Sequence, residues 1–194
     1  SYRGMNEIEL LVMAERNGDS YYTPDVIVHR DSDLYSMEDL QGHTFAFTDP
    51  LSFSGHMVIE DYLERQGTVP ERYFKRFFYT YNHDKSIWAV ANKLVDGASI
   101  DSQIYEYAKL RNPSLTDNLR IVSSLRPSPT GPVVISKRVP PEQKAQLQKI
   151  FLQMNQDPET GEAMQQLIID RFVIPQPELY EPLKKIYRRS SVIL

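Results

Sequence analysis

The chain of 194 residues contains no cysteine, and this absence excludes several kinds of chemistry at once. Thiol catalysis, disulfide bonds and Cys-ligated zinc sites all depend on the cysteine sulfur. The histidines do not replace it, because His29, His43 and His56 lack partners at the spacing of metal ligands. We therefore expect no metal site, and the sequence indicates no cofactor.

Long apolar runs and an excess of positive charge are also missing. No apolar stretch approaches the roughly 18 residues that a membrane span needs, and Ser1-Tyr2-Arg3-Gly4 does not resemble a basic and apolar leader. A secreted protein trimmed of its leader would begin in the same way, so the location stays open on these grounds. The net charge of −4 gives no electrostatic reason to expect a nucleic-acid partner.

The common catalytic motifs are absent as well. The sequence has no nucleophile elbow, no Walker loop, no dinucleotide fingerprint and no paired-carboxylate pattern. Its candidate site residues are rich in neutral hydrogen-bond donors and poor in groups that transfer protons. We therefore expect a protein that binds a ligand without catalysing a reaction. An enzyme is an alternative that these residues do not favour.

What the sequence does contain is an alternation of short apolar segments and helical patterns. Strands are expected at Val26–Arg30, Thr44–Thr48, Phe77–Tyr79 and Gly97–Ile100, and helices at Ser54–Gln66, Ser86–Leu94 and from Asp101 or Ser102 to Leu110. This alternation predicts an α/β fold with a mostly parallel sheet covered by helices on both faces. Ligands of such sheets bind beyond the carboxyl ends of the strands, where residues 49–54, 81–86 and 101–102 form loops.

A second region follows, with strands expected at Arg120–Ser124 and Pro132–Ser136 and helices from Pro140 onward. The first of these helices carries an apolar stripe of Leu147, Ile150, Phe151 and Met154, which we expect to face the core.

The junction from Thr48 to Gly55 is the most informative segment for function. It joins an apolar strand to a helix, and the start of a helix leaves backbone N–H groups without intrahelical acceptors. The hydroxyls of Ser52 and Ser54 stand beside those donors, and the helix dipole adds partial positive charge. These features predict an anion pocket. On the residues alone, a plain N-cap by Ser52 or Ser54 is the alternative.

His83 and Asp101 come from the other two loops. An imidazole at the edge of the sheet can donate a hydrogen bond to an anionic oxygen, although a lone histidine is more often a solvated or core side chain. The Asp101 carboxylate either caps the following helix or accepts a hydrogen bond from a ligand amine or hydroxyl. The sequence leaves both alternatives open.

Five phrases in this order resemble the phosphate/phosphite/phosphonate-binding branch of the type II periplasmic solute-binding proteins. They are Tyr22-Thr23-Pro24-Asp25-Val26-Ile27-Val28, Asp39-Leu40-Gln41-Gly42-His43-Thr44-Phe45-Ala46-Phe47, Asp49-Pro50-Leu51-Ser52-Phe53-Ser54-Gly55, His83-Asp84-Lys85-Ser86-Ile87-Trp88-Ala89-Val90 and Val95-Asp96-Gly97-Ala98-Ser99-Ile100-Asp101-Ser102. The segment from Phe151 to Tyr180 resembles the end of the same family. The resemblance runs from about Tyr22 to Tyr187.

The resemblance implies two α/β lobes joined by two crossing strands, with a ligand clasped between the lobes. Candidates for the crossing strands are Val26–Arg30 and Arg120–Ser124. The implied division is residues 1–29 as a remnant of the first lobe, 30–119 as the second lobe, and 120–194 as the return strand and C-terminal helices of the first lobe. The first lobe would then be incomplete, because the family's first two βα units have no counterpart in this sequence.

For the site, the resemblance implies that Ser52, Ser54, Gly55 and His83 hold an oxyanion and that Asp101 lines the cleft. One departure concerns Phe53, because the family usually has threonine there. Losing one hydroxyl donor to a charged oxygen forfeits about 1.5–3 kcal/mol, and an aromatic residue would instead face a larger or less charged ligand. Phe53 is therefore also a candidate ligand-binding residue. The position of a carboxylate for a ligand amine, near Gln103, is not clearly matched.

The function implied is that of an extracytoplasmic solute-binding protein, periplasmic or membrane-anchored, that delivers a small phosphonate- or phosphate-like ligand to an ABC transporter permease. The alternative is the periplasmic ligand-sensing domain of a membrane signalling protein such as a histidine kinase. In either case the ligand would stabilise a closed form of the two lobes.

Overall fold

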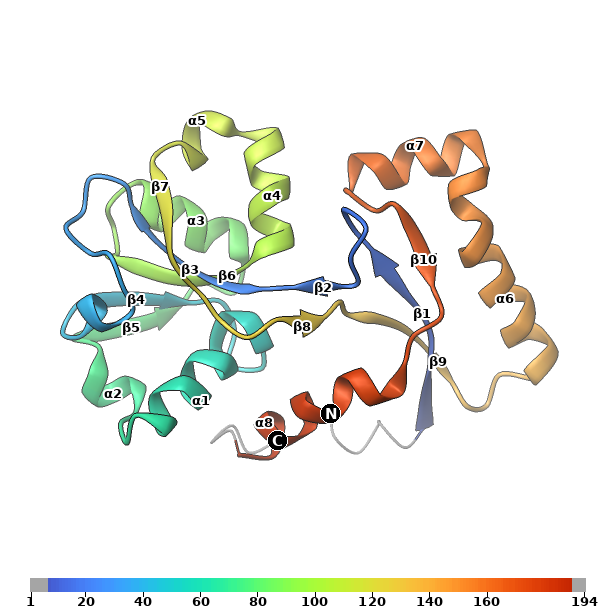
Figure 1. Cartoon of the computed structure of the whole chain (residues 1–194), viewed down its shortest axis with the longest axis horizontal. Helices are drawn as coiled ribbons and strands as arrows, with labels where there is room; N and C mark the ends of the chain where they lie inside the picture. The colour runs from blue at the N-terminus through green and yellow to red at the C-terminus, as the bar shows by residue number, and fades with distance from the viewer. Residues whose placement is uncertain (1–6, 190–194) are drawn as a thin grey trace. The chain divides into compact units, whose positions relative to one another are not determined.

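The computed structural model describes residues 7–189, which form two compact units. Unit 1 contains the described residues up to Tyr22 together with Ser128–Pro182, and unit 2 contains Thr23–Pro127 with residues 183–189. The chain therefore passes into unit 2 after Tyr22 and returns after Pro127. Figure 1 shows the elements of each unit.

Unit 2 is built on a five-stranded sheet in the order β5-β4-β6-β3-β7. Its elements are β3 (Pro24–His29), η2 (Glu38–Leu40), β4 (Thr44–Phe47), η3 (Phe53–Met57), α1 (Val58–Arg65), α2 (Pro70–Tyr73), β5 (Arg76–Tyr79), α3 (His83–Ala91), β6 (Gly97–Asp101), α4 (Ser102–Arg111), α5 (Pro113–Thr116) and β7 (Leu119–Ser124). Strand β4 runs parallel to β5 and β6, whereas β3 runs antiparallel to β6 and β7. Of the strands described in this sheet, β3 is the one that opposes the others, which confirms the mostly parallel α/β expectation for unit 2.

Helices cover both faces of this sheet because side chains alternate along each strand. On β4, Ala46 points to one face and packs in a cluster with Ile87 and Val90 of α3. Phe45 and Phe47 point to the other face, where the Phe45 ring stacks on Phe74 at 4.3 Å between centroids. Every residue of β3 is buried, since this strand is paired on both edges and covered on both faces.

Unit 1 has a three-stranded sheet in the order β10-β1-β9, with both strand pairs antiparallel. Its elements are β1 (Ile8–Glu15), β2 (Tyr21–Tyr22), β8 (Ser128–Pro129), β9 (Pro132–Ser136), α6 (Pro141–Gln153), η4 (Met154–Gln156), α7 (Pro158–Gln166), β10 (Arg171–Val173) and η5 (Pro177–Tyr180), and α8 (Glu181–Arg189) follows. Strands β2 and β8 pair with each other where the chain leaves and re-enters the unit. The sequence analysis did not predict the strand at Ile8–Glu15.

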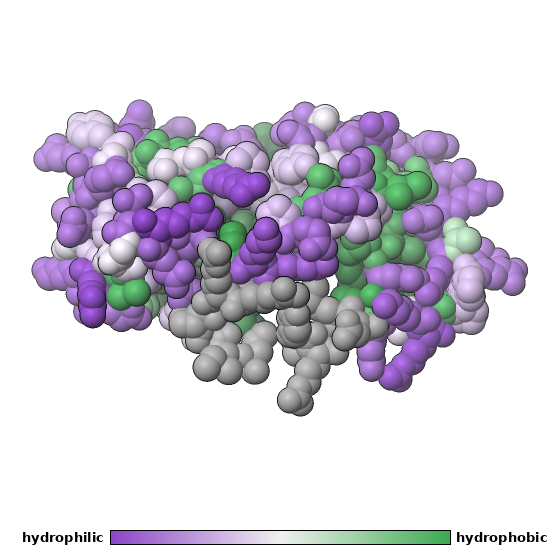
Figure 2. Space-filling view, turned by 60° about the horizontal axis from the view of Figure 1, so that its bottom comes forward, coloured by the Kyte–Doolittle hydropathy of each residue, from purple (hydrophilic) through white to green (hydrophobic). Residues whose placement is uncertain are grey.

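The expectation for the apolar stripe of α6 is partly wrong. Phe151 packs against the buried pair Leu11 and Val12, but α6 has no fully buried residue, and Leu147 and Ile150 are 40% and 59% exposed. In the view of Figure 2, hydrophobic side chains gather on the surface that unit 1 forms.

The candidate crossing strands Val26–Arg30 and Arg120–Ser124 correspond to β3 and β7, which pair with each other inside unit 2. The chain passes between the units just before β3 and shortly after β7. The lobe boundaries inferred from the sequence stay a prediction. Within residues 7–189, no helix combines the length and the apolar character that crossing a bilayer requires.

Candidate functional site

Three loops meet at the carboxyl ends of the adjacent parallel strands β5, β4 and β6, as expected for a site in an α/β sheet. Hydrogen bonds join these loops to one another. The Tyr81 N–H donates to the Thr48 carbonyl oxygen at 2.6 Å, and the Asp101 N–H donates to the Nδ1 atom of His83 at 3.2 Å. The loops after β4, β5 and β6 are therefore held as one rigid surface.

The loop after β4 enters its helix through a wide turn. The Met57 N–H donates to the Ser52 carbonyl oxygen, and the Val58 N–H donates to the Phe53 carbonyl oxygen, so both bonds span five residues instead of four. Ser52 caps this turn by accepting a hydrogen bond from the Gly55 N–H at 3.1 Å. Among the described residues, the N–H groups of Phe53 and Ser54 have no acceptor. These two amides are the free donors that the sequence pattern predicts at a helix start.

The Ser52 and Ser54 hydroxyls lie next to these amides. The Ser52 oxygen accepts from Gly55 and keeps its own proton free to donate, so the N-cap and the ligand-binding role are compatible in one side chain. Ser54 is only 4% exposed, and its carbonyl oxygen accepts a 2.5 Å hydrogen bond from the Ser99 hydroxyl on β6. The turn is thus fastened to the sheet, while the N–H groups of Phe53 and Ser54 have no acceptor among the described residues.

Gly55 allows the turn to approach the end of β4 closely. A Cβ atom at this position would lie 1.6 Å from Oγ1 of Thr48. The Thr48 N–H donates to the Gly55 carbonyl oxygen at 3.1 Å, whereas the buried Thr48 hydroxyl has no partner in residues 7–189. Only a glycine fits here, because any side chain would push the turn away from the strand.

A second contact fixes the start of the same loop. The buried His56 ring lies 3.1 Å from the Pro50 carbonyl oxygen through Nδ1 and 3.2 Å from the Tyr79 hydroxyl through Nε2. Its Nδ1 therefore donates to Pro50, and its Nε2 accepts from Tyr79. Both ring nitrogens serve to position the loop.

His83 is the first residue of α3, and Asn82 caps that helix. Because Nδ1 accepts the Asp101 N–H, the neutral ring carries its proton on Nε2, which leaves one donor for a ligand. Burial lowers the pKa of His83 to about 4, and the nearby Asp84 carboxylate opposes this only weakly. At neutral pH, His83 is therefore a neutral donor in the ligand-free protein.

This shift has a measurable consequence for stability. Between the ordinary pKa of 6.5 and the folded value of about 4, the unfolded chain binds a proton at His83 that the folded chain does not. Acidification through this window therefore favours unfolding, and the stabilisation is fully present above about pH 6.5. We expect His83→Gln to show a smaller loss of the free energy of unfolding between pH 7 and pH 4.5, measured by urea denaturation. An equal loss in both proteins would contradict the assignment.

Asp101 caps α4, with one carboxylate oxygen accepting from the Gln103 and Ile104 N–H groups at 2.8 and 3.4 Å. Of the two roles that the sequence left open, the structure shows the cap. The Phe53 side chain is 9% exposed and belongs to the interior, so what Phe53 can offer a ligand is its amide. The structure brings Ser52, Ser54, Gly55, His83 and Asp101 to the same edge of the sheet.

Sequence reasoning missed the residues that support these groups, Thr48 and Ser99. Both are polar residues in or next to strands that are otherwise apolar, and both are buried. A hydroxyl within a buried strand or directly after one is a signal that could have identified them. In the described part of the chain, no cluster of His, Cys, Asp and Glu is arranged to hold a metal ion.

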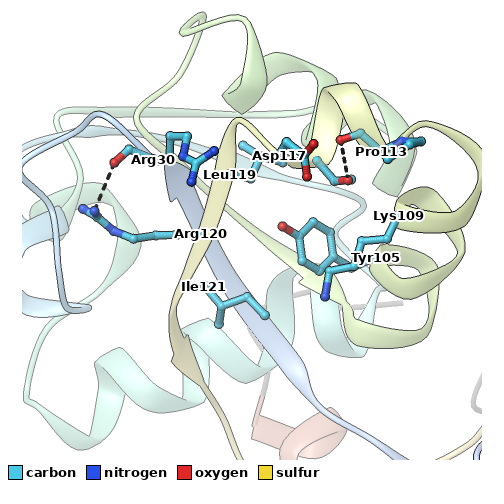
Figure 3. Close-up of a pocket in the computed structure, with 9 residues that line it drawn as sticks. Arg30, Tyr105, Lys109, Pro113, Asp117, Leu119, Arg120 and Ile121 are labelled. Carbon is cyan, nitrogen blue, oxygen red and sulfur yellow. Dashed lines mark hydrogen bonds between the residues drawn. The ribbon is translucent and has the colours of Figure 1, made fainter.

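A cavity of about 460 Å³ opens elsewhere in unit 2 (Figure 3). Arg30 and residues 119–121 line it on one side, and Tyr105, Lys109 and Pro113 line it on the other. One cation of its lining, the Arg120 guanidinium, donates hydrogen bonds to the backbone carbonyl oxygens of Arg30, Ser32 and Leu34. This cavity contains none of the six candidate residues, and we do not assign the ligand to it.

Comparison with known proteins gives a consistent result. The family described as "ABC transporter, phosphonate, periplasmic substrate-binding protein" matches residues 2–180. The phosphonates-binding periplasmic protein of Escherichia coli K12 is 27% identical over 157 residues, which cover 78% of this chain and 46% of that protein.

Two solved structures are similar in fold. A binding protein component of a phosphonate ABC transporter from Pseudomonas aeruginosa gives a TM-score of 0.85 at 25% identity, covering 93% of this chain and 62% of that one. A Prochlorococcus marinus protein in complex with methylphosphonate gives a TM-score of 0.81 at 20% identity, covering 95% of this chain and 72% of that one. The chain thus spans about half the length of the curated relative and less than two thirds of the Pseudomonas protein.

Proposed function

Because the chain belongs to the phosphonate-binding family of periplasmic substrate-binding proteins of ABC transporters, we propose that its Ser52–Gly55 turn binds the oxyanion end of a phosphonate- or phosphate-like ligand. The main support is that, among the described residues, the N–H groups of Phe53 and Ser54 have no acceptor and lie at a helix start flanked by two serine hydroxyls.

The donors of this site suit a tetrahedral oxyanion. Two amides, the hydroxyl protons of Ser52 and Ser54, and Nε2–H of His83 are all neutral donors, and the helix dipole adds positive potential. A hydrogen bond from such a donor to a charged oxygen is about twice as strong as one between neutral groups. Asp101, at the edge of the same surface, would lie beside the organic part of the ligand.

The family description favours import over signalling. It names a transporter component, and nothing in the described residues points to a fused signalling module. The partner of this protein would be the membrane permease of an ABC importer, on the extracytoplasmic side. The family binds substrates for transport, and we propose no catalytic step for this chain.

Titration calorimetry tests this function directly. We expect the 194-residue protein to bind methylphosphonate or phosphate. It should not bind dimethyl methylphosphonate, a neutral analogue of similar shape whose oxygens carry no charge. The absence of binding to methylphosphonate, phosphate and phosphite would contradict the proposal. Equal binding of the neutral ester would show that the pocket does not recognise a charged oxygen.

A further inference from the structure

A buried carboxylate lies close to the candidate site without belonging to it. Asp25 on β3 is 3% exposed, although it is one residue from the start of the strand. Its Oδ1 atom accepts a hydrogen bond from the Thr23 hydroxyl at 2.8 Å, and the Ser124 side chain also hydrogen-bonds to this carboxylate. Asp25 therefore connects the residue at which the chain enters unit 2 with the last residue of β7.

Thr23 continues this connection to the third site loop. Its N–H donates to the Ser102 hydroxyl at 3.0 Å, and its carbonyl oxygen accepts from the Ser102 N–H at 3.0 Å. Ser102 directly follows Asp101, whose own N–H donates to His83. Hydrogen bonds thus connect Asp25 to Thr23 and Thr23 to Ser102, the peptide bond links Ser102 to Asp101, and a further hydrogen bond connects Asp101 to His83.

The Asp25 carboxylate is buried, and burial disfavours its charged form. Burial raises the pKa of Asp25, and the negative charge of Glu106 acts in the same direction. The hydrogen bonds from Ser124 and Thr23 and the positive charge of Lys109 lower it. Lys109 lies on α4, the helix that flanks β7 in Figure 3. A buried carboxylate is weak evidence that a residue stabilises the fold. The hydrogen bonds that Asp25 accepts say more about its role.

We propose that Asp25 is a positioning residue for ligand binding, which holds Thr23 so that Thr23 fixes Ser102, Asp101 and the His83 ring in their binding geometry. This inference rests on the proposed function for its ligand, but the geometry it describes can be measured without one.

The chain contains a matched control for this arrangement. Asp96 accepts hydrogen bonds from the Thr44 N–H and the Thr44 hydroxyl at 2.8 and 2.7 Å. This Thr–Asp pair lies at the amino end of β4, opposite the end that carries the site. Removing Asp96 should therefore lower stability without changing the geometry of the site.

The experiment compares Asp25→Ala, Asp25→Asn, Thr23→Val and Asp96→Ala at a temperature at which all four variants are folded. Asn keeps an oxygen that can accept from Thr23, so Asp25→Asn should retain the affinity for methylphosphonate. Asp25→Ala and Thr23→Val should weaken it about three- to thirtyfold, the usual range for indirect coupling. In ligand-free, ¹⁵N-labelled protein, Asp25→Ala should also move the amide resonances of Asp101 and Ser102, and Asp96→Ala should not.

Unmoved Asp101 and Ser102 resonances in Asp25→Ala would overturn the inference whatever the ligand. An equal loss of affinity in Asp25→Ala and Asp96→Ala would overturn it as well, because it would show a general effect of destabilisation. If the unmodified protein binds no phosphonate or phosphate, the proposed function fails, and the resonances still decide whether Asp25 positions the loop.

Discussion

Gly55→Ala is expected to destabilise the protein more than alanine at any other glycine that the structure describes. The new Cβ would lie 1.6 Å from Oγ1 and 2.7 Å from Cβ of Thr48, and 2.9 Å from Oγ of Ser52. Overpacking of this kind costs about 1–3 kcal/mol and occasionally more. Since the Thr48 backbone cannot move without disturbing β4, we expect a loss of at least about 3 kcal/mol in the free energy of unfolding, together with loss of ligand binding.

Urea denaturation of Gly55→Ala and Gly131→Ala gives the matched comparison. No atom lies within 4 Å of the position that a Cβ on Gly131 would take, so Gly131→Ala should change stability little. Adding Thr48→Ala to Gly55→Ala removes the closest atom but leaves the Thr48 Cβ, so stability should recover only in part. A stable Gly55→Ala protein that binds its ligand normally would show that the turn does not pack against Thr48 as described.

Ser54→Ala is expected to have the largest effect on affinity with little effect on folding. The hydroxyl makes no hydrogen bond within the described residues, whereas the bond that fastens the turn, from Ser99, goes to the Ser54 backbone oxygen. Losing one donor to a charged oxygen costs about 1.5–3 kcal/mol, or roughly a ten- to hundredfold weaker affinity. Ser52→Ala should weaken binding similarly and also lower stability by about 0.5–2 kcal/mol through loss of the cap.

Calorimetric titration with methylphosphonate, alongside urea denaturation, separates the two effects. Ser114→Ala is a suitable control, because Ser114 is exposed on α5 and far along the chain from the turn. Unchanged affinity in both Ser52→Ala and Ser54→Ala would show that the ligand binds elsewhere.

Much of unit 2 follows from local sequence signals. The apolar segment of β4, the start of α4 at Asp101 or Ser102 and the end of the first helix near Gln66 were predictable, because each depends on a few neighbouring residues. Gly67 has a φ of +74°, the left-handed conformation that ends many helices and favours glycine. The anion site at Ser52–Gly55 stays a prediction that also rests on neighbouring residues.

Other features depend on contacts that local patterns do not contain. The wide turn at Phe53–Met57 arises because Thr48 and Ser99 fasten Gly55 and Ser54 to two different strands. The tautomer of His83 depends on Asp101, which is 18 residues away. The exposure of Ile150 could not be predicted, because an apolar stripe shows only that a helix face could be covered and not that it is.

If the amides of Phe53 and Ser54 donate to a negatively charged oxygen, ligand binding must change their backbone resonances. The decisive experiment is a titration of ¹⁵N-labelled protein with methylphosphonate. At saturation, we expect the amide protons of Phe53 and Ser54 to shift downfield more than any others. Saturable binding that leaves these two resonances in place would contradict this expectation.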